Sequence, residues 1–192
     1  MDKSKNKSNK ILLGIQLILT LLGTILSVVL LIRTITTGPT FLGILGSVVY
    51  VISYIALIFY ATRNYKKKEN IYFQGVIYAY AALLGIQILQ AGNFISDYGL
   101  APNVVLLINC CNIISFANVI KFADNLDTKK VALAYILIAV ILKLIVELYL
   151  IVKMFAYIQL IHILISLSIP LLGVIIILTY IHRIKRLNRV LN

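Results

Sequence analysis

The sequence predicts an all-α polytopic integral membrane protein built as a bundle of six transmembrane helices. Three observations carry this prediction. Hydrophobic residues make up 61% of the 192 residues, whereas a soluble domain is about 45–50% apolar. Six apolar segments are each long enough, at about 20 residues, to cross a hydrocarbon core of about 30 Å. The basic residues lie almost entirely in the short connections and tails around these segments.

The first three predicted spans each follow a recognisable boundary. The span over residues 11–32 comes after a basic stretch, and its apolar run is longer than the roughly 7–15 residues of a signal peptide, so we expect it to be retained. The span over residues 41–62 follows a Gly-Pro turn signal. The span over residues 71–90 follows Asn70, which is a candidate N-cap residue.

The last three predicted spans are joined by short connections. Residues 100–120 follow a connection with two glycines, and residues 131–152 follow two consecutive lysines. Only three residues separate the fifth span from the sixth, which covers residues 156–181, so these two spans are expected to form a tight antiparallel hairpin. No linker is long enough to divide the chain, and we therefore expect a single domain over residues 1–192.

The distribution of positive charge predicts how the bundle lies in the membrane. Most of the 18 Lys and Arg residues belong to the chain ends and to two connections: four lie in residues 1–10, four in 63–68, three in 121–130 and four in 183–189. The opposite connections carry only Arg33 and Lys153. Because Lys and Arg accumulate in cytoplasmic loops, we expect both termini to be cytoplasmic. The Ile-, Lys- and Asn-rich composition favours a bacterial source and hence a location in the cell membrane.

The formal net charge of +12 also bears on partners. In a soluble protein this charge would indicate nucleic acid. Here it lies in short runs between apolar segments, so we expect no nucleic-acid partner. We expect contact with the lipid bilayer and with anionic lipid headgroups at the cytoplasmic face. A small polar solute, a protein partner and a second copy of the chain are all open as further partners.

Two ionisable residues stand inside the fifth span, in AVILKLIVELYLIVK. Each costs about 2.5–3.5 kcal/mol on membrane-insertion scales. Lys143 lies near the middle of the span and Glu147 lies four residues further toward the outside. Since residues four apart share one helix face, they are predicted to form an ion pair within the membrane.

Polar residues on two neighbouring spans are expected at a similar depth. In the sixth span, Gln159 and His162 begin a polar stripe that continues through Ser166 at helical spacing. The fourth span contributes Asn109 and Asn112. At about 1.5 Å of rise per residue, these groups and the predicted ion pair all fall in the outer half of the bundle.

This cluster supports two hypotheses for function. The first is a small transporter or substrate-binding permease subunit, whose polar cavity opens to the outside and binds a solute or a proton through Lys143, Glu147 and the polar residues around them. In this hypothesis His162 is a candidate proton acceptor. The alternative is a non-catalytic immunity, regulatory or assembly factor, in which the cluster is structural.

The sequence favours a role other than catalysis. His162 and His182 are the only histidines, and 20 residues of helix separate them by about 30 Å, so they cannot share a metal ion. Ser166 lies one turn from His162, but a serine and a histidine at this spacing are not specific for a hydrolase. We therefore predict no metal site and no cofactor.

Overall fold

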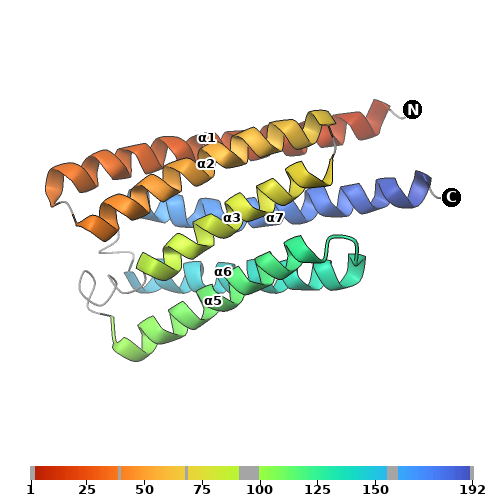
Figure 1. Ribbon diagram of the computed structural model, residues 1–192. Helices are drawn as coiled ribbons and strands as arrows, with labels where there is room; N and C mark the ends of the chain where they lie inside the picture. The colour runs from red at the N-terminus through yellow and green to blue at the C-terminus, as the bar shows by residue number, and fades with distance from the viewer. Residues whose placement is uncertain (1–2, 39, 68, 91–99, 155–159, 191–192) are drawn as a thin grey trace.

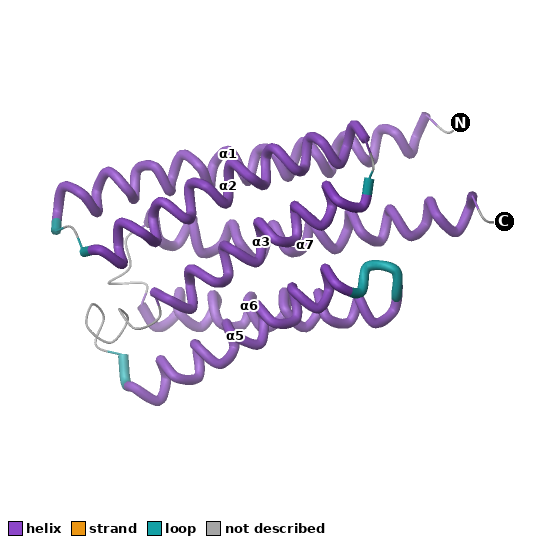
Figure 2. Tube along the Cα trace, in the orientation of Figure 1, coloured by secondary structure: helices purple, strands orange, loops and turns teal. Residues whose placement is uncertain are grey.

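The protein is an all-helical bundle in the part of the chain that the computed structural model describes, residues 3–38, 40–67, 69–90, 100–154 and 160–190 (Figures 1 and 2). The helices in these residues are α1 (Lys3–Thr37), α2 (Phe41–Lys67), α3 (Asn70–Gln90), α5 (Pro102–Asp124), α6 (Lys129–Met154) and α7 (Leu160–Val190). All six are long and apolar enough to cross a membrane. The predicted helical class and its six helices of spanning length are therefore confirmed.

The helix ends extend beyond several predicted spans. Helix α1 begins at Lys3 and α2 continues to Lys67, because a helix can run on past the hydrocarbon core that the apolar pattern detects. Residues 156–159 of the sixth predicted span lie outside the described residues. The predicted tight hairpin between the last two spans lies largely outside them too.

Helix α3 lies at the centre of the packing. It contacts α2, α5 and α7, while α1 packs against α2 and α7, and α6 packs against α5 and α7. Both chain ends lie at the same end of the bundle (Figure 1). Helices that follow one another along the chain run in opposite directions (Figure 1).

Two glycines leave space for tyrosine rings where neighbouring helices approach each other. A Cβ atom at Gly23 on α1 would lie 2.3 Å from a ring carbon of Tyr54 on α2. A Cβ atom at Gly75 on α3 would lie 2.4 Å from a ring carbon of Tyr60. Real Cβ contacts are not this short, so these two positions require glycine for the space it leaves, in keeping with the use of small residues between membrane helices.

Three aromatic side chains pack against one another in the core, near the end of the bundle where the termini lie. Phe73 on α3 stacks on Tyr180 on α7 with their centroids 6.2 Å apart, and Phe122 on α5 meets Tyr180 edge-on at 4.9 Å. The Tyr180 hydroxyl donates a hydrogen bond to the Leu126 carbonyl at 3.1 Å. This aromatic cluster ties three helices together at a single level.

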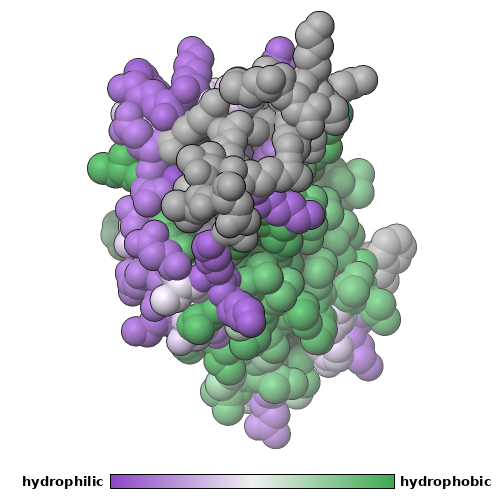
Figure 3. Space-filling view, turned by 90° about the vertical axis from the view of Figure 1, so that its right-hand side faces the viewer, coloured by the Kyte–Doolittle hydropathy of each residue, from purple (hydrophilic) through white to green (hydrophobic). Residues whose placement is uncertain are grey.

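The outward faces of the helices are apolar. Ile18 on α1 is 67% exposed and Val152 on α6 is 78% exposed, and most other large exposed hydrophobic residues lie along the same outward faces. Seen toward the end that holds the termini, hydrophilic side chains gather on one part of the surface and hydrophobic ones on another (Figure 3). The bundle is therefore suited to contact a lipid bilayer along its sides.

Candidate functional site

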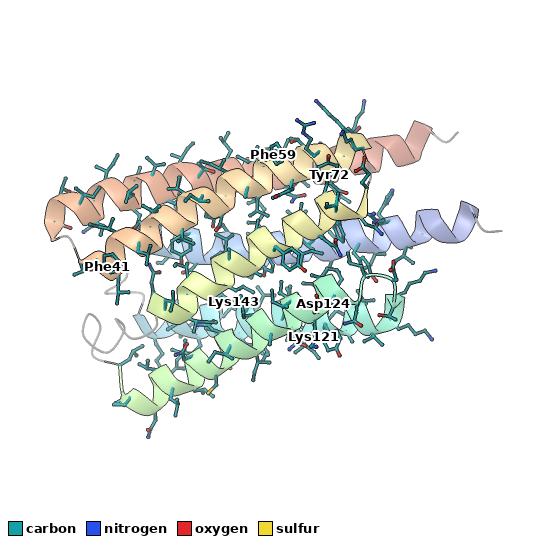
Figure 4. The ribbon with its side chains drawn as sticks, viewed as in Figure 1. Phe41, Phe59, Tyr72, Lys121, Asp124 and Lys143 are labelled. Carbon is teal, nitrogen blue, oxygen red and sulfur yellow. The ribbon has the colours of Figure 1, made fainter. Side chains whose placement is uncertain are left out.

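An ion pair lies inside the bundle on α6. The ammonium group of Lys143 is paired with the carboxylate of Glu147, four residues along the same helix. Only 1% of Lys143 and 2% of Glu147 is exposed, and Figure 4 labels Lys143 within the bundle. At about 1.5 Å per residue, Glu147 lies about 10 Å from the end of α6 at Met154. The predicted ion pair is therefore present.

Two other helices supply partners for this pair. The Nζ atom of Lys143 donates to Oδ1 of Asn112 on α5 at 3.2 Å. The Nε2 atom of Gln87 on α3 donates to Oε1 of Glu147 at 3.4 Å. A carboxylate only accepts hydrogen bonds and an ammonium group only donates them, so the pair fixes the orientation of both amides. We call Gln87, Asn112, Lys143 and Glu147 the polar network.

Three buried polar atoms near the polar network have no hydrogen-bond partner among the described residues. They are Oε1 of Gln87, Oδ1 of Asn109 and the hydroxyl oxygen of Tyr80. Asn109 lies one turn from Asn112 on the same face of α5, and Tyr80 is close enough to Glu147 to interact with its charge. A buried polar atom without a partner costs about 1–3 kcal/mol, a cost that a hydrogen bond to water or to a ligand would offset.

Tyrosines from α2 complete the surroundings of Glu147. Tyr50 and Tyr54 both lie within electrostatic range of its carboxylate. The hydroxyl groups of Tyr54 and Ser168 are 2.6 Å apart, and Ser168 donates its one proton to the Ile165 carbonyl at 2.7 Å. Tyr54 must therefore be the donor to Ser168, and this bond links α2 to α7.

The structure brings together part of the predicted site. Lys143, Glu147 and Asn112 are in direct contact, and Asn109 is adjacent on α5. Gln159 lies outside the described residues. His162 belongs to the first turn of α7, and its side chain is outside the part of the structure that is described.

Sequence reasoning missed the specific partners that α2 and α3 supply. Gln87 lies near the end of the predicted span over residues 71–90, but its contact with Glu147 depends on how α3 packs. Tyr50, Tyr54 and Tyr80 lie in apolar runs and look like ordinary core aromatics. Their positions in the middle of spans, away from the membrane interfaces that tyrosine prefers, were the available signal.

The described residues contain no group of side chains suited to bind a metal ion. Within them, no three His, Cys, Asp or Glu side chains converge. The arrangement instead offers a carboxylate, an ammonium group, amide oxygens and phenolic hydroxyls inside the bundle. Such a set can hold a small polar molecule or a proton through hydrogen bonds and charge.

The chain matches no protein-family model, no curated protein and no solved structure.

Proposed function

We propose that the protein is a small multi-pass membrane transporter or substrate-binding permease subunit, which binds a small polar solute at the polar network. The observation that supports this most is the incomplete hydrogen bonding around a buried ion pair. An intramembrane charge is costly and is usually retained for function. A partly satisfied polar network is less stable than an apolar core, so a bound solute or water gives this network a physical reason to exist.

The unpaired atoms indicate the chemistry of the solute. The oxygens of Gln87 and Asn109 accept hydrogen bonds, so the solute brings N–H or O–H donors to them. The hydroxyl of Tyr80 can donate, so the solute also carries an acceptor. A charged solute could separate Lys143 from Glu147 and pair with either one. A small zwitterionic or hydroxylated molecule meets these requirements.

The distribution of charge also supports a proposal for the orientation of the bundle. We propose a bacterial cell-membrane location with both termini in the cytoplasm. In support, both chain ends lie at the same end of the bundle as the α2–α3 and α5–α6 connections (Figure 1), and the basic residues cluster in the helix ends next to these connections. A cysteine introduced at Thr37 is expected to react with a membrane-impermeant thiol reagent in intact cells, and one at Lys67 is not. Labelling with the opposite pattern would reverse the orientation.

Water access distinguishes a binding cavity from a sealed core. With the native cysteines replaced by alanine, Asn109→Cys is expected to react with a small impermeant thiol reagent added to intact cells. Leu107→Cys is the matched control, since it lies two residues from Asn109, on the other side of α5, and is 65% exposed where lipid excludes water. Equal lack of reaction at both positions would contradict an open cavity.

The alternative is a non-catalytic membrane protein, such as an immunity, regulatory or assembly factor, in which the polar network only joins helices. The observation that favours it is that both charges already receive a hydrogen-bonding partner from a neighbouring helix. Under this alternative Asn109→Cys stays unreactive. Glu147→Gln then alters the folding stability and the activity of the protein in proportion. In a transporter, Glu147→Gln abolishes transport in protein that still folds.

A further inference from the structure

We propose that the end of the bundle where both termini lie holds a second binding site, for the phosphate group of an anionic lipid headgroup or of a soluble phosphate ester. The site is a cavity of about 610 Å³ walled by α1, α2, α3, α6 and α7. None of its lining residues belongs to the polar network. This inference therefore does not depend on the transport proposal.

The charge of the cavity favours an anion. Lys66, Lys129 and Arg183 line it, and Asp127 is the one acidic residue among the lining residues. These residues come from α2, α7 and the region where α6 begins, so three distant segments of the chain place cations around one space. Phosphate is bound in proteins by such converging Arg and Lys groups.

A buried amide supplies an independent indication of a ligand. Gln16 on α1 lines the cavity and is only 6% exposed. Its Nε2 atom has no hydrogen-bond partner among the described residues. An N–H donor that is buried without an acceptor is costly. A phosphate oxygen inside the cavity would satisfy it, and a purely apolar occupant would not.

The guanidinium group of Arg183 is held in a defined orientation. It donates to Oδ1 of Asn64 at 3.2 Å and also to Oδ1 of Asn70. It lies over the ring of Phe73, 5.1 Å from the centroid. Asp127, which also lines the cavity, is close enough to interact with the charge of the guanidinium group. The planar group has five N–H donors in total. Arg183 is therefore held at the cavity wall in a fixed orientation, with more donors than the two amide oxygens accept.

The rest of the lining fits an amphiphilic molecule. Leucine side chains from α1 and the α5–α6 connection, with Ala61 and Ile184, give the cavity apolar walls. Phe73 and Tyr180 also line it, and their stacked rings belong to the aromatic cluster that closes the core. A headgroup with its glycerol portion could thus enter from the membrane side, while a soluble phosphate ester would enter from the water phase.

The test uses the full chain purified in a neutral detergent. Binding of a fluorescent phosphatidylglycerol is followed by anisotropy, with unlabelled phosphatidylglycerol, phosphatidylcholine and glycerol 3-phosphate as competitors. We expect saturable binding that phosphatidylglycerol displaces and phosphatidylcholine does not. Displacement by glycerol 3-phosphate as well identifies a site for soluble phosphate esters, and its failure to displace identifies a lipid site.

Two variants and one control locate the binding. Gln16→Leu removes one hydrogen bond to a charged group and is expected to weaken binding roughly tenfold. Arg183→Gln is expected to weaken it at least as much. Lys121→Gln is the control, because this lysine is exposed at the same end of the bundle (Figure 4) and does not line the cavity.

The result for Gln16→Leu decides the matter if Arg183→Gln fails to fold, since Gln16 is not one of the three residues described above as orienting Arg183. The proposal is overturned if no saturable binding occurs. It is also overturned if phosphatidylcholine competes equally, or if Lys121→Gln weakens binding as much as Gln16→Leu does.

Discussion

Replacing Lys143 by methionine leaves the carboxylate of Glu147 in the bundle without its cationic partner. Methionine keeps most of the side-chain volume, so the change is mainly one of charge. Glu147 is 2% exposed and, among the residues that the structure describes, retains the 3.4 Å hydrogen bond from Gln87 alone. Removing one member of a buried ion pair costs about 3–5 kcal/mol. We expect the free energy of unfolding to fall by that amount, a large part of the roughly 5–15 kcal/mol that stabilises a typical domain.

Removing both charges is expected to restore part of the lost stability. Replacing a buried ion pair by apolar residues of similar volume is often neutral or stabilising. Lys143→Met already leaves the Asn112 amide without its partner, so Lys143→Met/Glu147→Leu adds only the unpaired amide of Gln87, about 1–3 kcal/mol, and removes the larger cost of a buried charge without a counterion. The double variant should therefore be more stable than Lys143→Met alone, and the cycle of single and double variants measures the coupling.

Unfolding by sodium dodecyl sulfate in mixed micelles provides the assay. The chain contains no tryptophan, so helix content from far-ultraviolet circular dichroism is the signal. Lys153→Met is the control, since Lys153 is exposed near the end of α6, and its effect should stay within about 0.5 kcal/mol. A loss below about 1 kcal/mol for Lys143→Met, or a double variant as unstable as the single one, would refute the reasoning.

Two further pairs of variants test interior contacts by the same assay. Tyr54→Phe should lower the free energy of unfolding by about 0.5–1.5 kcal/mol, because it removes the hydrogen bond to Ser168. Tyr80→Phe should be neutral or slightly stabilising, because it removes a buried hydroxyl with no partner among the described residues. Equal costs for the two variants would contradict both assignments. Gly173→Ala should destabilise by about 1–3 kcal/mol through overpacking, since its Cβ would lie 2.6 Å from the Tyr80 hydroxyl oxygen. A Cβ atom at Gly14 would have nothing within 4 Å, so Gly14→Ala should stabilise the protein by up to about 1 kcal/mol through the better helix propensity of alanine. A loss of stability for Gly14→Ala as large as that for Gly173→Ala would argue against the close packing described at Gly173.

The helices were predictable because the bilayer simplifies the problem. A chain in lipid must satisfy its backbone hydrogen bonds locally, so each long apolar run becomes a helix. The run over residues 71–90 agrees with α3 (Asn70–Gln90) to within a residue. The ends of α1 and α2 were less predictable, since charged residues beyond the apolar run continue the helix into the interface.

Part of the candidate site could be predicted for a similarly local reason. Lys143 and Glu147 are four residues apart on one helix, and helical geometry alone brings them together. Asn112 could be assigned a depth from its place in the span. The cavity around Arg183 was not predicted, because its walls come from five helices.

By itself, the sequence determined the helical class, the helices of spanning length and the pairing of Lys143 with Glu147, because each depends on residues that are close along the chain. Only the tertiary structure decided that Gln87 and Asn112 complete the polar network and that Gln16 meets Arg183 in one cavity. These contacts depend on how each helix rotates about its axis and on which helices are neighbours. Packing between helices sets the rotation of each helix and the choice of its neighbours. The order of apolar and polar residues along a single helix does not.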